Sequence, residues 1–477
     1  MDYNRPKGTR DFSSIEMNKR NYIIQVMRKK FELFGFSPIA TPSFENISTL
    51  IGKYGIEGDY LMFKLLHSGN FLKKEISNFF KKNKKMTMDL LYNFLITRLS
   101  NKALIYDLTV PFVRYVGMHR NEIIFPFKRY QIQPVWRADK PQKERFREFY
   151  QCDADIIGYD VSLWQEIELI KLCDDIFTKL NFPIIIHMNH RDILGGLIEI
   201  AGISNNLWKD FTTSLDKWNK MGKHIVKKEM LRKGITPKSF EKISYFLDLD
   251  KKENFSKKME YFIKALQSYK RGKKGIKDLN FIFQKIKKIS LKKTKLKWDL
   301  SLARGMNYYT GTIFEIYPYN HNNNYYQVDD KKNSIGGGGR YDQLSSFFGI
   351  KNISGVGVSL GLDRIYLSMD KKNLLQNISN FPSKVLFINF GDEEVLYAYP
   401  MINFLRKKGI STQLYPNFIR IHKQFKYAND NHIPFVIIIG KNEIEKKKIR
   451  VKNIQKRKEI EFDNIYGVIH HILKNPL

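Results

Sequence analysis

Residues 133–155 have the sequence QPVWRADKPQKERFREFYQCDAD, in which two strand-like runs flank a short polar loop. Successive side chains of a strand point to opposite faces, so the second run separates into two sets. The even-numbered set is mostly apolar: Phe146, Tyr150, Cys152, Ala154 and, one step further, Ile156. The odd-numbered set is mostly polar: Arg145, Arg147, Phe149, Gln151, Asp153 and Asp155. The pattern predicts an antiparallel hairpin with one face in a core and the other facing water or a ligand.

The polar face of this hairpin carries the ring of Phe149 among arginines and carboxylates. Such a combination suits a nucleotide, because the base stacks on the ring while guanidinium groups hold phosphate oxygens. A plain solvent-facing edge is the alternative.

Two further segments contain residues that commonly contact ligands. Asp107 and Thr109 are two apart in an extended segment, which predicts a carboxylate and a hydroxyl side by side, able to hold an ammonium group. The glycine run 336–339 permits close backbone approach to a flat ligand, although it also suits a plain turn. The run is not a Walker loop, and no GxGxxG opens a helix after a strand, so the two commonest nucleotide-binding folds are disfavoured.

The segment LARGMNYYTGT, residues 302–312, brings together the cation of Arg304, the phenols of Tyr308 and Tyr309, and two glycines. This composition favours a site for a polar ligand. A surface turn with stacked tyrosines is the alternative for the segment taken alone.

The composition of the 477 residues, 43% hydrophobic and 27% charged, predicts a soluble chain of roughly two to four domains. No window offers the roughly 18 apolar residues of a membrane span, and the first residues lack the apolar core of a secretory signal, so we expect a cytoplasmic protein without a membrane partner. Cys152 and Cys173 are too few for a disulfide framework, and we expect both to be reduced and one or both to be buried. The net charge of +34 favours a polyanionic partner or reflects the lysine usage of an AT-rich genome, and the sequence leaves both open.

The hydrophobic pattern predicts several domains. In chain order it indicates a helix over 15–34 with an extended segment to Pro42, helices around a solvated loop over 60–103, antiparallel strands over 104–157, a helix over 162–180, a strand over 184–188, lysine-rich helices over 195–295, strands over 296–317, an Asn-rich flexible loop, and a compact α/β domain after Pro382.

The segment GVGVSLGLDR, residues 355–364, predicts a small-residue strand running into a helix that begins near Leu360 and presents Arg364. Together with the helix that precedes Pro42 and the hairpin around Arg137, it forms an ordered set that resembles the class II aminoacyl-tRNA synthetases. The Arg304 segment and GGGGRYD, residues 336–342, narrow the resemblance to the histidyl-tRNA synthetases. The resemblance covers nearly the whole chain.

The resemblance implies an α+β fold with an antiparallel-sheet catalytic core. Its expected parts are the first part of the core (1–194), a helical insertion (195–295), the second part of the core (296–375) and an α/β anticodon-binding domain (384–477). It also implies a homodimer whose contact includes the helix and strand up to Pro42. In this family histidine and ATP give histidyl-adenylate and pyrophosphate, and the histidyl group then passes to the terminal ribose of tRNA(His).

Matching by residue, the resemblance implies these ATP-binding residues: Arg137, Asp139, Arg145, Phe149 and Arg364. It implies these histidine-binding residues: Asp107, Thr109, Arg137, Gln151, Asp155, Arg304, Tyr308 and Tyr309. Catalysis falls to Arg304, Arg137 and Arg364. Mg²⁺ is expected to arrive with ATP and not in a cage of protein ligands.

Specific roles follow for several of these residues. Arg137 is expected to grip the α-phosphate, Arg364 to reach the γ-phosphate and adenine, and Phe149 to lie under the base. Asp107, Thr109 and Gln151 are expected to bind the α-ammonium group, while Asp155 and Tyr309 bracket the imidazole and Tyr308 packs beside it. A carboxylate and a phenol would satisfy the donor and the acceptor nitrogen of a neutral imidazole. The chain departs from the common family pattern at Asp139, Asn307 and Ile105, where Glu, Asp and Arg are usual.

Contacts with tRNA are implied in two places. The loop Lys140–Glu144 resembles the family's acceptor-stem loop, and Lys423, Lys426 and Tyr427 in the C-terminal domain offer cations and a ring to exposed bases, although a solvated helix explains them equally well. A non-catalytic regulatory paralogue and a synthetase for glycine, proline or threonine are the rival functions; Arg304 and the C-terminal domain argue against the first, and the paired tyrosines against the second.

Replacing Arg304 with alanine is expected to slow adenylate formation by roughly 10² or more, because a fixed guanidinium would stabilise charge that develops on the α-phosphorus. No side-chain base is needed, since the carboxylate of the amino acid is already ionised. Histidine-dependent pyrophosphate exchange measures the effect, and the fold should be unchanged. Turnover near that of the wild type would eliminate the role.

Overall fold

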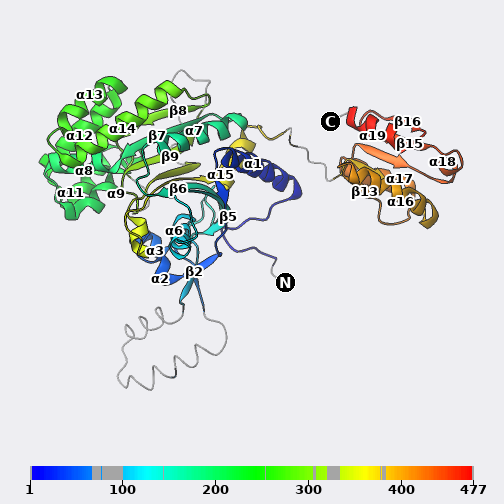
Figure 1. The fold of residues 1–477 in the computed structure, drawn as a ribbon, viewed down its shortest axis with the longest axis horizontal. Helices are drawn as coiled ribbons and strands as arrows, with labels where there is room; N and C mark the ends of the chain where they lie inside the picture. Colours follow the sequence, from blue (N-terminus) through cyan, green and yellow to red (C-terminus); the bar gives the residue numbers. More distant parts are fainter. Residues whose placement is uncertain are drawn as a thin grey trace. The chain divides into compact units, whose positions relative to one another are not determined.

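The computed structural model describes residues 3–66, 77, 100–142, 144–252, 254–303, 308–319, 334–376, 378 and 383–474. The chain divides into two compact units, Met1–Gln376 and Asn377–Leu477 (Figure 1). Most of the region where helices were expected over 60–103, and the Asn-rich loop, lie outside the described residues. No helix in the described ranges is both long and apolar enough to cross a membrane.

A mixed sheet of eight strands forms the centre of the first unit. Its spatial order is β1 (Ser37–Pro38), β5 (Phe127–Trp136), β6 (Glu148–Gly158), β11 (Ser354–Gly361), β10 (Gly336–Arg340), β9 (Thr312–Pro318), β7 (Ile184–His190) and β8 (Thr294–Trp298). The strands from β5 to β7 are antiparallel, and each edge strand runs parallel to its neighbour. The predicted hairpin is β5–β6, with Val135 opposite Phe149, and the antiparallel-sheet fold class is confirmed.

Three helices, α1 (Ser14–Leu33), α7 (Trp164–Lys179) and α15 (Leu362–Lys371), pack together on one side of this sheet (Figure 1). α1 begins with a reciprocal capping box between Ser13 and Glu16, which satisfies two backbone donors. Its buried Ile23, Met27 and Phe31 recur every four residues and form one apolar stripe. The helix predicted over 15–34 is therefore present. It is amphipathic because one face is buried in the core and the other is exposed.

The even-numbered face of β6 is the face that these helices cover. The guanidinium of Arg20 in α1 lies 5.6 Å from the ring centre of Tyr150 and donates to Asp363 of α15 at 2.5 Å. The second carboxylate oxygen of Asp363 accepts from the backbone N–H of Tyr150 at 2.9 Å. Cys152 and Cys173 are free and buried in this layer, as predicted. The polar odd-numbered face of β6 is left on the opposite side of the sheet.

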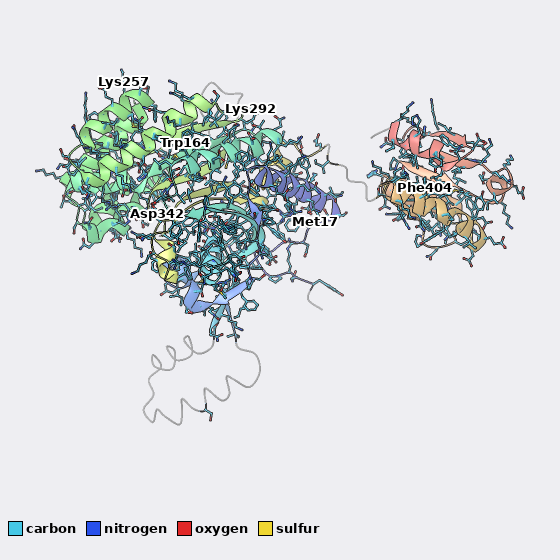
Figure 2. All side chains as sticks on the ribbon, in the orientation of Figure 1. Met17, Trp164, Lys257, Lys292, Asp342 and Phe404 are labelled. Carbon is cyan, nitrogen blue, oxygen red and sulfur yellow. The ribbon has the colours of Figure 1, made fainter. Side chains whose placement is uncertain are left out.

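A module of helices follows β7 and returns the chain to β8. It comprises α8 (Arg191–Ala201), η1 (Asn205–Leu207), α9 (Trp208–Leu215), α10 (Trp218–Met221), α11 (Lys223–Arg232), α12 (Pro237–Lys252), α13 (Phe255–Leu266) and α14 (Lys270–Ile289). α8 and α14 approach closely where Gly196 faces Gly272, since a Cβ at Gly196 would lie 2.7 Å from the other glycine's Cα. Lys257 on α13 is exposed on the outside of the module (Figure 2), whereas the neighbouring Lys258 is buried and donates to the carbonyl oxygen of Trp298 at 3.1 Å.

The expectation of strands throughout 104–157 is wrong for one segment, because α6 occupies Thr109–Met118. Asp107 therefore does not share a strand with Thr109; its Oδ1 accepts from the backbone N–H of Val110 at 3.1 Å and caps the first turn. Pro111 lies in that first turn, where its missing N–H costs no helical hydrogen bond. Six of the ten residues of α6 are buried, and the first five of them are consecutive, so this part of the sequence reads as a short apolar run that does not distinguish a helix from a strand.

Smaller elements complete the first unit. They are β2 (Phe44–Asn46), α2 (Ile47–Leu50), α3 (Gly55–Tyr60), β3 (Lys64–Leu65), β4 (Lys102–Leu104) and η2 (Leu344–Phe348). β2, β4 and β3 form a three-stranded sheet in that order.

The second unit is the compact α/β domain expected after Pro382. Its sheet has the order β13 (Thr412–Leu414), β12 (Val385–Phe387), β14 (Phe435–Ile438), β15 (Ile449–Asn453) and β16 (Lys458–Phe462), and its helices are α16 (Asp392–Lys407), α17 (Ile421–Asp430), α18 (Lys441–Glu445) and α19 (Ile465–Lys474). Alternate residues of β12 join different cores: Phe387 packs with α16 and α19, whereas Leu386 packs with α17. Helices therefore cover both faces of this sheet.

The glycines of β10 give a direct test of packing in the first unit. A Cβ at Gly338 would lie 2.1 Å from the carbonyl oxygen of Gly357 and 2.6 Å from Cζ of Phe314. We expect Gly338→Ala to lower the free energy of unfolding by about 1–3 kcal/mol or more, because the central strands must separate. Gly117→Ala in α6 is the control, since its nearest contact would be an ordinary 3.4 Å. Equal stability of the two variants in urea denaturation would contradict this packing.

Candidate active site

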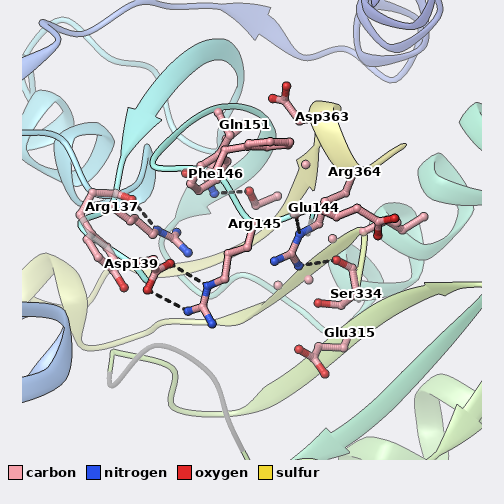
Figure 3. A pocket seen from close by; sticks show the side chains of 18 of the residues that line it. Arg137, Asp139, Glu144, Arg145, Phe146, Gln151, Glu315, Ser334, Asp363 and Arg364 are labelled. Carbon is pink, nitrogen blue, oxygen red and sulfur yellow. Dashed lines mark hydrogen bonds and ion pairs between the residues drawn. The ribbon is translucent and has the colours of Figure 1, made fainter. Parts of the chain in front are cut away.

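A cavity of about 440 Å³ opens on the odd-numbered face of β6. Its wall is built from the β5–β6 hairpin and its loop, from β9 to β11, from the start of α15, and from the segment around Tyr54 (Figure 3). Seven of the predicted site residues line it: Arg137, Asp139, Arg145, Phe149, Gln151, Tyr309 and Arg364. Residues that are 227 positions apart in the chain thus share one cavity.

Three guanidinium groups converge on this cavity (Figure 3). Arg145 forms a bidentate ion pair with Asp139, at 3.0 and 2.8 Å. Arg137 and Arg364 pair with no carboxylate in the described part of the chain; they donate to the backbone carbonyls of Tyr106 at 3.1 Å and of Ser334 at 2.7 Å. Burial, and then the charges of Arg145 and Arg137, lower the pKa of Arg364. A cluster in which two of three guanidinium groups have no carboxylate partner is suited to a polyanion.

The floor of the cavity is the all-glycine part of β10. Gly336, Gly337 and Gly338 line the cavity. A Cβ at Gly336 would lie 2.8 Å from the carbonyl oxygen of Ser359, so the neighbouring strands leave no room for a side chain. The predicted turn alternative is wrong for this run, because it is a strand paired on both sides. A bare backbone floor admits a flat ligand.

Aromatic rings flank the arginines. The Arg137 guanidinium carbon lies 4.4 Å from the ring centre of Tyr106 and 5.2 Å from that of Phe149. Tyr309 lines the cavity near the far end of β10, where a Cβ on Gly339 would lie 2.9 Å from its ring. Burial, and then the nearby carboxylates of Asp155 and Asp107, raise the pKa of Tyr309, so it is a neutral phenol at physiological pH.

Asp107 lies beneath the cavity and accepts hydrogen bonds from two tyrosine hydroxyl groups. Its Oδ1 accepts from Tyr54 at 2.9 Å and its Oδ2 from Tyr308 at 2.7 Å. Burial raises the pKa of Asp107, and the hydrogen bonds from Tyr308, Val110 and Tyr54 oppose the rise. Burial and the charge of Asp107 raise the pKa of Tyr308, and the nearby Thr109 side chain opposes the rise. Asp107, Thr109 and Tyr308 are thus brought together, but none of them lines the cavity in the described structure.

Asp155 is likewise buried and paired. Its Oδ1 accepts from the Tyr341 hydroxyl at 2.6 Å, and its Oδ2 lies 2.8 Å from Nη2 of Arg129, which is fully buried. Arg129 also donates to the carbonyl oxygen of Leu108 at 3.2 Å. Asp155 therefore supports the cavity from below and does not line it.

A second buried network approaches the cavity wall from the helical module. Nδ1 of His187 lies 2.8 Å from Oδ2 of Asp299, and the His187 ring centre lies 5.1 Å from that of Tyr317. Tyr317 lines the cavity and donates a short hydrogen bond to Glu315, which also lines it. Asn219 of α10 donates to Asp299 at 3.3 Å and to Ser301 at 2.5 Å. His187 thus has a structural role, because it joins β7 to the Asp299 carboxylate.

Several residues of the cavity wall and of the buried layer beneath it were missed by the sequence analysis. Extending the two-residue alternation to β5 would have found Arg129, which lies directly opposite Asp155, and extending it to β11 would have found Ser359. Tyr54 carried no such signal, since 53 residues separate it from Asp107. Arg304 and Asn307 lie outside the described residues. Within those residues, no group of three or more His, Cys, Asp and Glu side chains could hold a metal ion.

An antiparallel sheet that carries a glycine-floored cavity with convergent arginines defines the catalytic core of a class II aminoacyl-tRNA synthetase. The family model described as Histidyl-tRNA synthetase matches residues 96–365, and one described as Anticodon binding domain matches residues 384–471. The chain belongs to the histidyl-tRNA synthetase family.

Individual relatives agree with this assignment. The chain is 48% identical to a histidine–tRNA ligase of Christiangramia forsetii, over 97% of this chain and 98% of the relative. It is 47% identical to that of Flavobacterium johnsoniae, over 96% of both chains. The crystal structure of histidyl-tRNA synthetase from Nostoc sp. PCC 7120 is similar with a TM-score of 0.78 and 26% identity, and covers 99% of each chain.

The His187–Asp299 pair makes stability depend on pH. Although burial opposes the shift, the hydrogen bond and charge of His187, the Ser301 hydroxyl and the charge of Lys297 hold the pKa of Asp299 well below its usual range. The pair therefore stabilises the fold above the unfolded-state pKa of about 3.9, and this contribution is lost as pH falls below that value. We expect Asp299→Asn to unfold at lower urea concentration at pH 7 and to lose less further stability on acidification. Glu199→Gln, exposed on α8, is the control. Parallel stability–pH curves for Asp299→Asn and wild type would refute the linkage.

Proposed function

We propose that the cavity binds histidine and ATP side by side, forms histidyl-adenylate, and delivers the histidyl group to tRNA(His). The observation that carries the proposal is the convergence of Arg137, Arg145 and Arg364 on one glycine-floored cavity. Family membership and the likeness to histidine–tRNA ligases over 96% or more of this chain support the substrate assignment.

The nucleotide half of the proposal rests on the hairpin. Arg137 takes the α-phosphate, and Phe149, adjacent to that guanidinium, stacks on adenine. Arg364 reaches the γ-phosphate and adenine. Arg145 adds a further cation for the phosphates, and Asp139 fixes it in place through its bidentate pair. Mg²⁺ enters on the phosphates of ATP as part of the substrate.

The histidine half rests on the other end of the cavity. Gln151 binds the α-ammonium group, and Tyr309 meets one imidazole nitrogen as a neutral phenol. Asp107 and Asp155 are retained as histidine-binding residues whose negative charge favours the ammonium group and the imidazole donor from the layer below. Thr109 and Tyr308 complete that layer. Arg304 is proposed as the main catalytic cation.

Chemistry in this site requires no side-chain base. The histidine carboxylate is ionised at neutral pH and attacks the α-phosphorus; the bond from this phosphorus to the oxygen that bridges to the β-phosphorus breaks, and pyrophosphate leaves with that electron pair. The arginines stabilise the negative charge that the phosphate oxygens gain. Holding both substrates in one cavity supplies the favourable orientation.

Four wider features belong to the same proposal. The functional domains are 1–194, 195–295, 296–375 and 384–477. The enzyme acts in the cytoplasm as a homodimer through the segment that ends at Pro42, where Leu33 is exposed at 67% of its surface. The Lys140–Glu144 loop meets the acceptor stem, and the lysine-rich helices clamp the acceptor arm. The domain 384–477 binds the anticodon, with Lys423, Lys426 and Tyr427 as contacts.

Amino-acid-dependent exchange between ATP and pyrophosphate tests the function. Histidine alone should support exchange, and the enzyme should then charge tRNA(His). Exchange with glycine, proline or threonine would replace the proposal with another synthetase, and no exchange with any amino acid would indicate a regulatory paralogue.

Asp139→Asn is expected to raise the KM for ATP by about tenfold, because Arg145 loses a charged hydrogen-bond partner. The KM for histidine should change by less than about twofold, since Asp139 and Arg145 lie at the nucleotide end. Glu148→Gln on the same hairpin is the matched control, because it keeps an acceptor for the Trp136 N–H. Equal changes in both Michaelis constants would count against this division of the cavity.

A further inference from the structure

Residues 299–303, here called the connecting turn, lead from the end of β8 to Arg304, which follows in the sequence. All five residues of the turn are buried, at 7% exposure or less. They belong to neither a helix nor a strand, so the course of their backbone depends on contacts with other elements.

The catalytic core holds the connecting turn from β7. Nδ2 of Asn189, a residue with no exposed surface, donates to the carbonyl oxygen of Leu300 at 3.1 Å and to that of Leu302 at 2.8 Å. Nδ1 of His187, on the same strand, lies 2.8 Å from Oδ2 of Asp299. Two side chains of one core strand thus hold three residues of the turn.

The helical module holds the same turn through Asn219 of α10. Nδ2 of Asn219 donates to Oγ of Ser301 at 2.5 Å and to Oδ2 of Asp299 at 3.3 Å. Ser301 in turn donates its hydroxyl proton to Oδ1 of Asp299 at 2.6 Å. Asn219 is exposed, whereas Asp299 and Ser301 are 7% and 6% exposed, so the module covers a buried hydrogen-bonded pair.

The charge of Asp299 determines which end of the Asn219 amide makes these contacts. Although burial opposes the shift, the hydrogen bond and charge of His187 hold the pKa of Asp299 well below its usual range, so its carboxylate is ionised at neutral pH. An ionised carboxylate only accepts hydrogen bonds, and the NH₂ group of an amide has two protons to donate. One amide therefore serves Asp299 and Ser301 together and fixes both relative to α10.

Loss of this amide would change the position of the turn more than the stability of the fold. Because Asn219 is exposed, water would supply Asp299 with a hydrogen bond in place of the amide. Water would not connect the turn to α10, however, and Ser301 and the residues after it would be less restricted. Such freedom matters for catalysis, since a displacement of about 1 Å can lower a rate by about 10²-fold.

We propose that Asn219 is a positioning residue for amino-acid activation: from the helical module it fixes the connecting turn, and thereby the point at which the chain enters the Arg304 segment. The inference rests on the proposed function, in which Arg304 is the main catalytic cation, and deepens it. Adenylate formation then depends on a contact between the helical module and the core, although Asn219 does not line the cavity.

The kinetics of histidine-dependent pyrophosphate exchange in Asn219→Ala test this role. We expect kcat to fall by about tenfold, the effect of one lost hydrogen bond to a charged group. The KM values for ATP and histidine should change by less than about twofold, because a misplaced group that acts only in the transition state lowers kcat and leaves KM unchanged. The midpoint of urea denaturation should stay close to that of the wild type, since water replaces the lost donor.

A double-mutant cycle with Arg304→Ala tests the route of the effect. Because Asn219 acts through Arg304, adding Asn219→Ala to Arg304→Ala should lower kcat further by less than about twofold. Asn206→Ala, which changes an exposed asparagine of the same module, is the matched control and should behave as the wild type. If Asn219→Ala does not fold, Asn219→Asp carries the same test, because it keeps the shape of the side chain but removes both donors and places a second carboxylate beside Asp299.

A kcat within about twofold of the wild type in folded Asn219→Ala or Asn219→Asp would overturn the inference. So would a loss of kcat that is just as large in the Arg304→Ala background, since Asn219 would then act by another route. A loss of kcat accompanied by an equal loss in Asn206→Ala would also count against it. Failure of the proposed function is a separate outcome, because the wild-type chain itself would then show no histidine-dependent exchange.

Discussion

The cavity exists because three antiparallel strands meet without side chains between them. In β10 a Cβ on Gly338 would lie 2.1 Å from the backbone of β11, and a Cβ on Gly357 of β11 would lie 1.9 Å from Oδ1 of Asp155 in β6. The strands can therefore pair only if glycine occupies these positions. The same requirement leaves bare backbone at the floor of the cavity and brings the arginines of the hairpin and of α15 around one space.

Beneath that floor, buried carboxylates hold other groups in place. Asp107 satisfies Tyr54 and Tyr308, and Asp155 satisfies Tyr341 and lies against Arg129. Buried charges are tolerated where each has such partners. Among the groups that line the cavity, the guanidinium groups of Arg137 and Arg364 have no carboxylate partner in the described residues and donate to backbone carbonyls. This division between paired supports and unpaired contacts is what allows one small cavity to bind two polar substrates.

Alternation along single strands revealed much of this site from the sequence. It correctly placed Phe149 and Gln151 on one face of a hairpin, and the helix ahead of Pro42 was predicted to within one residue at each end. It failed for α6, whose first five residues are all buried and read as a continuous apolar run. It also missed Tyr54, because its importance arises only from a contact across 53 residues. Periodicity reports which face a residue occupies, whereas a contact between distant segments depends on the register of strands that the sequence does not reveal.

The most direct test of the shared cavity is a crystal structure with a non-hydrolysable histidyl-adenylate analogue, such as histidyl-sulfamoyl-adenosine. The account predicts adenine on the ring of Phe149, the sulfamoyl group beside Arg137, the amino group at Gln151 and the imidazole at Tyr309. An analogue bound outside the cavity, or bound within it with adenine at the Tyr309 end, would contradict the account.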